Sequence, residues 1–136
     1  MAARLGSLDY VMLRAADVAA LVAVYRDTLD AVPIEEAYPR WARIRLANVD
    51  LGIHVDEGFD GRSELPSGAV LAFRVHDIAS LRAALDAAGF TTGAYEVIPG
   101  GVRVDLRDPC GNALAAIQWG GRIEDLPGGA GSDAPA

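Results

Sequence analysis

The sequence has no lysine, a single cysteine and no long apolar run, and these absences exclude several classes of protein. Cys110 has no partner within the chain, which excludes an internal disulfide bond. No apolar stretch approaches the roughly 20 residues that a membrane-spanning helix needs. Residues 1–7 contain Arg4 but no apolar stretch that ends in a cleavage pattern, so we expect no signal peptide. A cytoplasmic location is the resulting expectation.

The charge of the chain is negative, and its positive side chains are all arginine. Nineteen Asp and Glu residues against twelve Arg residues give a formal net charge of −7. Nucleic-acid binding is disfavoured, because contacts with phosphates supply most of the affinity of that class and require a positive surface. Arginine can still bind a carboxylate, phosphate or sulfate group in a bidentate manner. The composition is therefore compatible with a small anionic ligand.

A nine-residue motif occurs twice at an offset of 60 residues. Residues 13–21 read LRAADVAAL and residues 73–81 read FRVHDIASL. Each copy follows a short apolar run and begins a helical pattern. The Asp in each copy, Asp17 or Asp77, can cap the free backbone N–H groups at the start of a helix. A strand-to-helix unit repeated at a fixed offset predicts two structural modules.

Hydrophobic periodicity and turn residues predict the same order of elements, βαβββ, in both modules. In the first module, residues 8–56, the predicted elements are a strand at 8–14, a helix at 17–30 and strands at 34–38, 41–47 and 49–55. In the second, residues 69–119, they are a strand at 69–75, a helix at 77–88 and strands at 90–97, 102–106 and 113–119.

The predicted fold is α+β, with two tandem βαβββ modules that form a curled mixed sheet within a single domain of residues 8–119. Residues 1–7 form an N-terminal extension, the polar residues 57–68 form a linker, and the Gly- and Pro-rich residues 120–136 are expected to be a flexible tail. Helices on one face leave a concave sheet surface on the other, and such a surface is a natural place for a pocket.

Three stretches of the chain carry a resemblance to a known family. Residues 8–14 lead into Asp17 and are followed by residues 24–29, the repeat occupies residues 73–81, and residues 106–112 read LRDPCGN. Together they resemble the vicinal oxygen chelate superfamily, which includes glyoxalase I, extradiol dioxygenases, fosfomycin-resistance enzymes and bleomycin-resistance proteins. The third stretch is close to the family's Asp-Pro-Asp-Gly-Asn turn, with Cys110 in place of the middle Asp. The resemblance covers roughly residues 8–119 and implies the same fold.

The resemblance also implies four metal-ligand positions, on the first and last strands of each module, where the family usually has His or Glu. They correspond to Tyr10, Gly52, Val70 and Ala115 in this sequence. Three of these side chains have no donor atom, and a tyrosine alone does not supply the several O or N ligands that a divalent cation requires. We therefore expect a branch of the family that lacks the metal ligands, with no metal and no other cofactor.

Alternation along the strands assigns side chains to the concave face. If Tyr10 faces it, so do Met12 and Arg14 on the same strand. Val102, Val104 and Leu106 alternate with Arg103 and Asp105 and are expected to pack on the helix side. The candidate ligand-binding residues are Tyr10, Arg14, Trp41, Arg43, Arg45, His54, Arg74, Arg103, Asp105 and Trp119.

Each type of candidate residue has a functional and a structural interpretation. Arg can clamp an anion, aromatic rings can stack on flat ligands, and His54 can exchange a proton. Alternatively, Arg14 and Arg74 form structural ion pairs across the junction of the modules, with Asp50, Asp105 or helix ends. Arg43, Arg45 and Arg103 would then be structural as well. Trp41 and Trp119 would then pack on the sheet or contact a second subunit.

Three functions are compatible with this sequence. The favoured one is a metal-independent protein that sequesters a small aromatic or anionic molecule, as bleomycin-resistance proteins do, and that forms a homodimer with no membrane or nucleic-acid partner. The second is a metal-free enzyme of the lyase or isomerase type, with Tyr10 or His54 as acid/base and Arg as an anion clamp. The third is a glyoxalase- or dioxygenase-type metalloenzyme with displaced ligands. Whether the protein is an enzyme stays open at this point.

Overall fold

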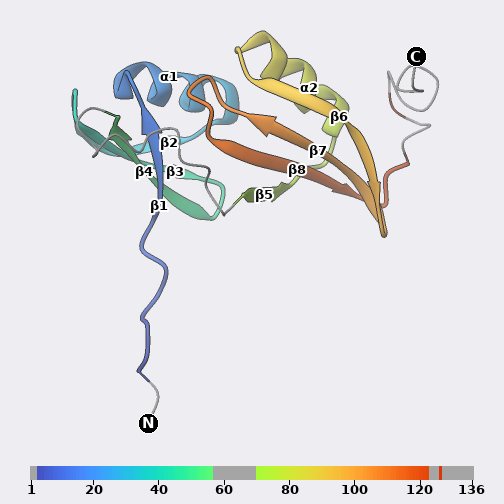
Figure 1. Ribbon diagram of the computed structural model, residues 1–136, viewed down its shortest axis with the longest axis horizontal. Helices are drawn as coiled ribbons and strands as arrows, with labels where there is room; N and C mark the ends of the chain where they lie inside the picture. The colour runs from blue at the N-terminus through green and yellow to red at the C-terminus, as the bar shows by residue number, and fades with distance from the viewer. Residues whose placement is uncertain (1–2, 57–69, 123–125, 127–136) are drawn as a thin grey trace. The chain divides into compact units, whose positions relative to one another are not determined.

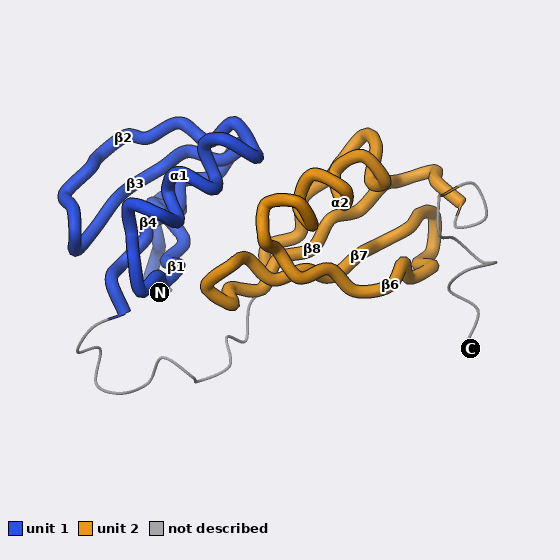
Figure 2. The backbone as a smooth tube through the Cα atoms, turned by 90° about the horizontal axis from the view of Figure 1, so that it is seen from above, with its two compact units in different colours: residues 1–64 blue, residues 65–136 orange. Residues whose placement is uncertain are grey.

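The structure is a computed structural model that describes residues 3–56, 70–122 and 126 (Figure 1). The chain divides into two compact units, residues 1–64 and residues 65–136 (Figure 2). Unit 1 contains β1 (Val11–Ala15), α1 (Val18–Leu29), β2 (Val32–Ala37), β3 (Trp41–Leu46) and β4 (Val49–Val55). Unit 2 contains β5 (Leu71–Arg74), α2 (Ile78–Ala87), β6 (Thr91–Ile98), β7 (Gly101–Arg107) and β8 (Ala113–Trp119). The predicted α+β class with βαβββ in both halves is confirmed.

Each unit has one four-stranded mixed sheet. The strand order is β1-β4-β3-β2 in unit 1 and β5-β8-β7-β6 in unit 2. In both sheets the first strand runs parallel to the last, and the other pairs are antiparallel. Met12 pairs with Gly52, and Ala72, which lies 60 residues after Met12, pairs with Ala115. The duplication seen in the sequence therefore extends to the register, and it makes Gly52 and Ala115 equivalent positions.

The core of each unit lies between its sheet and its helix. In unit 1 the α1 residues Val18, Leu21, Val22 and Tyr25 are at most 2% exposed and face the inward side chains of β1, β3 and β4. In unit 2 the inward residues include Val102, Val104 and Leu106, as alternation predicts, together with Ile78 and Leu85 of α2. The opposite face of each sheet carries charged side chains, among them Arg43 and Arg45 of β3 and Arg103 and Asp105 of β7. Among the described residues, no helix is long and apolar enough to span a membrane.

The helix ends follow the repeated motif. Asp17 accepts a hydrogen bond from the backbone N–H of Ala20 at 3.0 Å, and Asp77 accepts one from Ser80 at 3.1 Å. Both predicted caps are confirmed. In α2 the N–H of Ile78 also donates to Oε1 of Gln118 on β8, at 2.8 Å. This bond ties the start of the helix to the last strand of its sheet.

Three strands begin two or three residues away from their predicted starts, and the other elements begin within one residue of theirs. Strand β1 begins at Val11 rather than at residue 8, and residues 8–10 are exposed outside the sheet. Strand β5 begins at Leu71 rather than at residue 69. Strand β2 begins at Val32, so Pro33 lies inside a strand, which is tolerated because β2 is an edge strand and proline needs no ladder partner there. The predicted linker and most of the predicted tail lie outside the described residues.

Gly101 lies opposite Trp119 at a point of β7 that leaves no room for a side chain beside β8. A Cβ atom built on it would be 2.6 Å from the carbonyl O of Gln118 and 3.1 Å from the Cα of Trp119. Because both are backbone atoms of the neighbouring strand, neither can move aside as a side-chain tip would. We expect Gly101→Ala to lower the free energy of unfolding, measured with urea, by about 2 kcal/mol.

Gly93→Ala on β6 is the matched control for this substitution. The nearest atom to a Cβ at Gly93 is the carbonyl O of Asp105, at an ordinary contact distance of 3.5 Å. Its effect is expected to stay within about 0.5 kcal/mol. Equal losses in the two variants would contradict the interpretation.

Candidate functional site

The open face of the unit 1 sheet, opposite α1, collects most of the predicted site residues. In the register, Arg14 and Trp41 lie on either side of His54, while Met12 and Arg43 lie on either side of Gly52. Arg45 pairs with Asp50 on the same face. The side chains that alternation assigned to this face in unit 1 therefore do share it.

Tyr10, Trp41 and His54 form a group that we call the aromatic cluster. The ring centroids of Tyr10 and Trp41 are 5.3 Å apart with an interplanar angle of 71°, and those of Trp41 and His54 are 6.4 Å apart at 67°. Both are edge-to-face arrangements, which the ring quadrupoles favour. The guanidinium carbon of Arg43 lies 5.4 Å from the Tyr10 centroid, within the range of a cation–π contact. These contacts hold the rings as one surface.

Gly52 is the residue that allows the aromatic cluster to form. A Cβ atom built on Gly52 would overlap the indole ring of Trp41 and would lie 2.7 Å from Cδ1 of Tyr10. The two rings therefore cover the backbone of β4 directly. In the sequence, Gly52 stands out only as a position that lacks the metal-ligating side chain of similar proteins. The sequence does not show that two rings fill the space over Gly52, because this depends on the three-dimensional arrangement.

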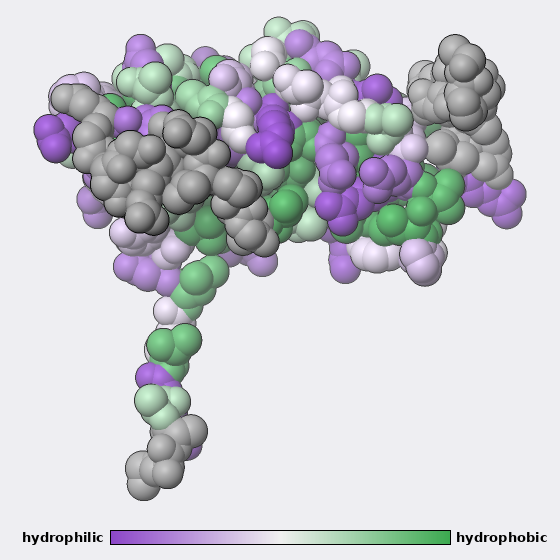
Figure 3. Space-filling view, viewed as in Figure 1, coloured by the Kyte–Doolittle hydropathy of each residue, from purple (hydrophilic) through white to green (hydrophobic). Residues whose placement is uncertain are grey.

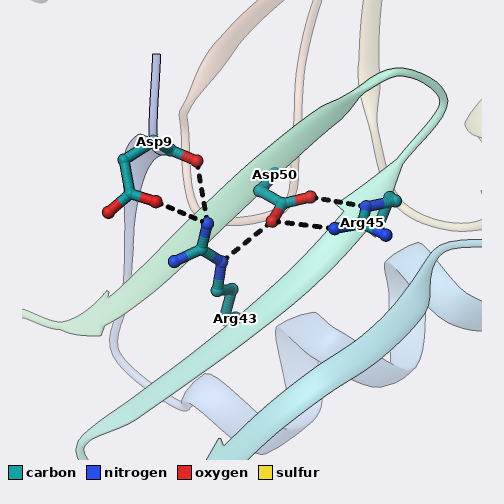
Figure 4. A network of polar contacts seen from close by, with 4 residues as sticks. All are labelled: Asp9, Arg43, Arg45 and Asp50. Atoms are coloured by element: carbon teal, nitrogen blue, oxygen red, sulfur yellow. Dashed lines mark hydrogen bonds and ion pairs between the residues drawn. The ribbon is translucent and has the colours of Figure 1, made fainter. Parts of the chain in front are cut away.

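An ionic network supports the cluster from one side (Figure 4). Asp50 accepts from Nε of Arg43 at 2.9 Å and from Nε of Arg45 at 2.7 Å, and its side chain is 11% exposed. Arg43 also donates through Nη2 to the backbone O and to Oδ1 of Asp9, at 2.9 and 2.8 Å. Arg43 and Arg45 are thus in ion pairs, as their structural interpretation allows, but their partner Asp50 is the residue expected for Arg14 or Arg74. Asp9, which joins the network through both its backbone and its side chain, was not predicted.

The network predicts a specific dependence of stability on pH. The hydrogen bonds from Arg45 and Arg43 hold the pKa of Asp50 below its ordinary value. A lowered folded-state pKa means that ionised Asp50 stabilises the fold above the unfolded-state pKa of about 3.9. That stabilisation is lost as the pH falls through the lowered folded-state pKa. We expect Asp50→Asn to be less stable than the wild type at pH 7, with a difference that shrinks below about pH 4.

Urea unfolding of both proteins at pH 7, 5 and 3 measures this difference. A stability gap that stays constant across the series would show that the charge of Asp50 contributes nothing.

His54 is held in one tautomer by a local contact. Its Nδ1 lies 2.8 Å from the carbonyl O of Val55. A carbonyl only accepts, so Nδ1 carries the hydrogen, and Nε2 of the neutral ring holds the lone pair. The ring is half-buried beside Trp41. In chemical terms, His54 is set up to accept a hydrogen bond or a proton through Nε2.

The open face of the unit 2 sheet carries the remaining predicted residues. The register places Arg74 and Arg103 on either side of Ile117, with Asp105 opposite Ala115 and Trp119 opposite Gly101. Arg103 donates to Asp105 through Nε at 2.9 Å. The partner of Asp105 is therefore a residue of its own strand, whereas the sequence interpretation names Asp105 as a partner for Arg14 or Arg74.

A cavity of about 320 Å³ lies over this part of unit 2. Val70, Arg103 and Asp105 line it together with Thr91 and Arg107. Arg107 donates to the carbonyl O of Gly111 at 2.8 Å. It continues the alternation of Arg103 and Asp105, so the same sequence pattern could have identified it.

The four positions that correspond to metal ligands in similar proteins do not fit a metal ion. Two rings cover Gly52, Ala115 is 1% exposed and has only a methyl group, and Val70 has no donor atom. Across residues 3–56 and 70–122, no three or more His, Cys, Asp or Glu side chains are grouped so that they could hold a metal. The chemistry available on the open faces is stacking, hydrogen bonding, charge pairing and proton exchange at His54 or Tyr10.

The comparisons with known proteins agree with this architecture. The model of the Glyoxalase/Bleomycin resistance protein/Dioxygenase superfamily matches residues 7–116. No curated protein matches the chain in sequence.

Solved structures share the fold at low sequence identity. A glyoxalase/bleomycin resistance protein/dioxygenase family enzyme from Burkholderia phytofirmans is 22% identical, with a TM-score of 0.71 over 84% of this chain and 99% of the other. A lactoylglutathione lyase from Agrobacterium tumefaciens is 21% identical, with a TM-score of 0.61 over 84% and 94%. A fosfomycin resistance protein from Listeria monocytogenes, complexed with Mn(II) and 1S,2S-dihydroxypropylphosphonic acid, is 14% identical, with a TM-score of 0.69 over 89% and 94%.

Proposed function

The chain belongs to the Glyoxalase/Bleomycin resistance protein/Dioxygenase superfamily, and from this premise we propose that it binds a small aromatic or anionic molecule without a bound metal. The mechanism is affinity alone, with no bond made or broken, as in an antibiotic-sequestering protein similar to bleomycin-resistance proteins. In this proposal the protein works as a cytoplasmic homodimer. Residues 8–119 of each copy form a single domain.

The observation that carries this proposal is the aromatic cover over Gly52. The rings of Tyr10 and Trp41 occupy the space where a ligating side chain would start. The rings of Tyr10 and Trp41, held edge-to-face at 71°, offer apolar ring faces whose ordering cost has already been met by edge-to-face and cation–π contacts, and a planar ligand stacks on one of them. This arrangement suits a planar molecule better than a metal and its hydration shell.

In the proposal, charged groups around the aromatic cluster bind an anionic substituent of the ligand. Arg43 is paired with Asp9 and Asp50, and Arg45 is paired with Asp50. The role of this network in the proposal is to hold Arg43 over the ring of Tyr10. Arg14, which lies opposite His54 in the register, is the cation assigned to a carboxylate or phosphate, with His54 as a hydrogen-bonding neighbour. Arg74, Arg103, Asp105 and Trp119 are proposed as further ligand-binding residues on the open face of unit 2.

A thermal-shift screen tests the proposal. The library pairs peptide antibiotics and aromatic carboxylates with their uncharged amides. We expect stabilisation by at least one aromatic carboxylate, weaker stabilisation by its amide, and at least a tenfold weaker response in Trp41→Leu. Ile34→Ala, which alters an exposed apolar residue of β2, is the matched control and keeps the full response. A stoichiometric metal found by elemental analysis would contradict the proposal, as would a screen in which Trp41→Leu responds as well as the wild type.

The tautomer of His54 favours a second candidate function, a metal-free enzyme of the lyase or isomerase type. With Nδ1 fixed by the carbonyl of Val55, Nε2 can act as a base on the open face, and the Tyr10 hydroxyl can act as an acid. Positioned acid–base groups contribute about 10²–10⁴-fold to a rate. Turnover of a bound molecule that is lost in His54→Ala or Tyr10→Phe, with binding retained, would establish this function. Binding without turnover in the wild type would exclude it for that molecule.

A further inference from the structure

Tyr10 contributes a ring to the aromatic cluster, although it lies outside the sheet that carries the cluster. The pairing of β1 with β4 begins one residue later, at Val11. Residues 3–10 belong to no helix or strand, and each of them is exposed. Figures 1 and 3 show the chain before β1 running away from the sheet. The strand ladder therefore does not account for the position of the Tyr10 ring on Gly52.

Arg43 on β3 makes contacts that reach this part of the chain (Figure 4). Strand β4 lies between β3 and β1 in the sheet, so the Arg43 side chain extends over β4 to Asp9. Nη2 of Arg43 donates to the backbone O and to Oδ1 of Asp9, at 2.9 and 2.8 Å. Nε donates to Oδ2 of Asp50 on β4, at 2.9 Å. The guanidinium is therefore held by two carboxylates, and we call its contacts with Asp9 the clamp.

The clamp acts on Tyr10 in two ways. The carbonyl of Asp9 belongs to the planar peptide unit that leads into Tyr10, so the bond from Arg43 fixes the orientation of that unit. The guanidinium carbon of Arg43 also lies 5.4 Å from the centroid of the Tyr10 ring. The same ring lies edge-to-face with Trp41, at 5.3 Å between centroids. The clamp and Trp41 together therefore fix both the backbone and the ring of Tyr10.

We propose that Asp9 is a positioning residue of the ligand site, because its contact with Arg43 holds the Tyr10 ring in the place where an aromatic molecule binds. This inference rests on the proposed function. Asp9 itself makes no contact with the bound molecule. Its side chain is 75% exposed, so the clamp is an ion pair that salt can screen. Exposed ion pairs change an equilibrium by up to about fivefold, which sets the size of the expected effect.

Removal of the Asp9 carboxylate separates the clamp from a direct effect of charge, because the two effects have opposite signs. Asp9 is negative and lies beside a site that is proposed to bind an anionic molecule, so loss of its charge alone would strengthen binding. Loss of the clamp releases the Tyr10 ring and weakens binding. The uncharged amide of the same molecule is insensitive to the direct effect and reports on the clamp alone.

Titration of the wild type and Asp9→Ala with the aromatic carboxylate selected by the thermal-shift screen, and with its amide, tests the proposal. In roughly 10 mM salt, where the Debye length is about 30 Å, we expect Asp9→Ala to bind both molecules about threefold to fivefold more weakly. In 1 M salt, where the Debye length is about 3 Å, the difference should fall below about 1.5-fold.

Asp27→Ala is the matched control for the titration. Asp27 forms an exposed ion pair with Arg26 on α1, at 2.9 Å, on the other face of the sheet. Asp27→Ala should bind both molecules as the wild type does. Equal or tighter binding of both molecules by Asp9→Ala at low salt would overturn the proposal.

Acrylamide quenching of Trp41 tests the clamp without any ligand. In a Trp119→Phe background Trp41 is the only indole. Release of the Tyr10 ring should expose Trp41, so we expect Asp9→Ala to raise its quenching constant by about 1.5-fold or more. In a Tyr10→Ala background Asp9→Ala should have no further effect, because Asp9 acts through Tyr10. An unchanged quenching constant in Asp9→Ala, or a full effect of Asp9→Ala without the Tyr10 ring, would overturn the proposal.

The two experiments separate failure of this inference from failure of the proposed function. A library in which no molecule binds contradicts the proposed function, while the quenching of Trp41 still decides whether the clamp positions Tyr10. Binding that depends on Trp41 but is unaffected by Asp9→Ala supports the proposed function and overturns the role of Asp9.

Discussion

Gly52→Ala is expected to weaken small-molecule binding at least tenfold while the protein stays folded. The added methyl group would overlap the indole of Trp41 and crowd the ring of Tyr10. Both rings are side chains on an open face and can rotate outward, so the loss of stability stays below about 2 kcal/mol. The aromatic surface is disrupted, however, because the rings can no longer lie on the strand. Titration with the best aromatic carboxylate from the screen measures the change in affinity.

Two further measurements separate displacement of the rings from a general loss of structure. In a Trp119→Phe background Trp41 is the only indole, and its emission should shift to the red when Gly52→Ala moves the ring into water. In a Trp41→Leu background, Gly52→Ala should weaken binding little further, because the two substitutions act on the same contact. Fully additive effects would show that Gly52 acts on binding by some route other than Trp41.

Asp108→Ala is expected to cause the largest loss of stability, about 3 kcal/mol, because several hydrogen bonds to one buried carboxylate are lost together. Asp108 is 3% exposed, and it accepts from the backbone N–H groups of Cys110 and Asn112 at 2.8 and 3.0 Å and from Nδ2 of Asn112 at 2.8 Å. These bonds close the turn between β7 and β8. Urea unfolding followed by circular dichroism measures the loss.

Substitution at Cys110 is the control within the same turn. Cys110 contributes its backbone N–H to the turn and its side chain is exposed. Cys110→Asp, which restores the residue usual in the family's turn, should change stability by no more than about 0.5 kcal/mol. We therefore expect the turn to depend on Asp108 and to tolerate exchange of residue 110. A loss in Cys110→Asp as large as that in Asp108→Ala would contradict this account.

Much of the fold could be predicted because local signals and periodicity agree. Asp17 and Asp77 mark the helix starts, Gly89 with φ +91° follows the second helix, and alternation separates the two sheet faces correctly. The least accurate boundaries are at strands whose ends depend on pairing. Tyr10 continues the apolar pattern of β1, yet β4 pairs with that strand only from Val11 onward.

The candidate site could be predicted as a set of residues on a face, but its internal contacts could not. Alternation indicates that Trp41 and Gly52 share a surface, but it does not show that one ring covers the other residue. Nothing local links Asp9 to Arg43, because their contact joins residues 34 positions apart. Such contacts arise from the path of the chain in three dimensions.

In each unit the first strand pairs with the last one, and this has a consequence for folding during protein synthesis. Among the strands that the structure describes, β1 pairs with β4 alone and β5 pairs with β8 alone. Gln118, close to the end of β8, also supplies the acceptor for the first N–H of α2. While the ribosome is still adding residues 70–112, the unit 2 helix lacks that acceptor and β5 lacks its neighbour. We expect the sheet of unit 1 to be complete in the nascent chain well before that of unit 2, because non-local pairing requires both strands to be present.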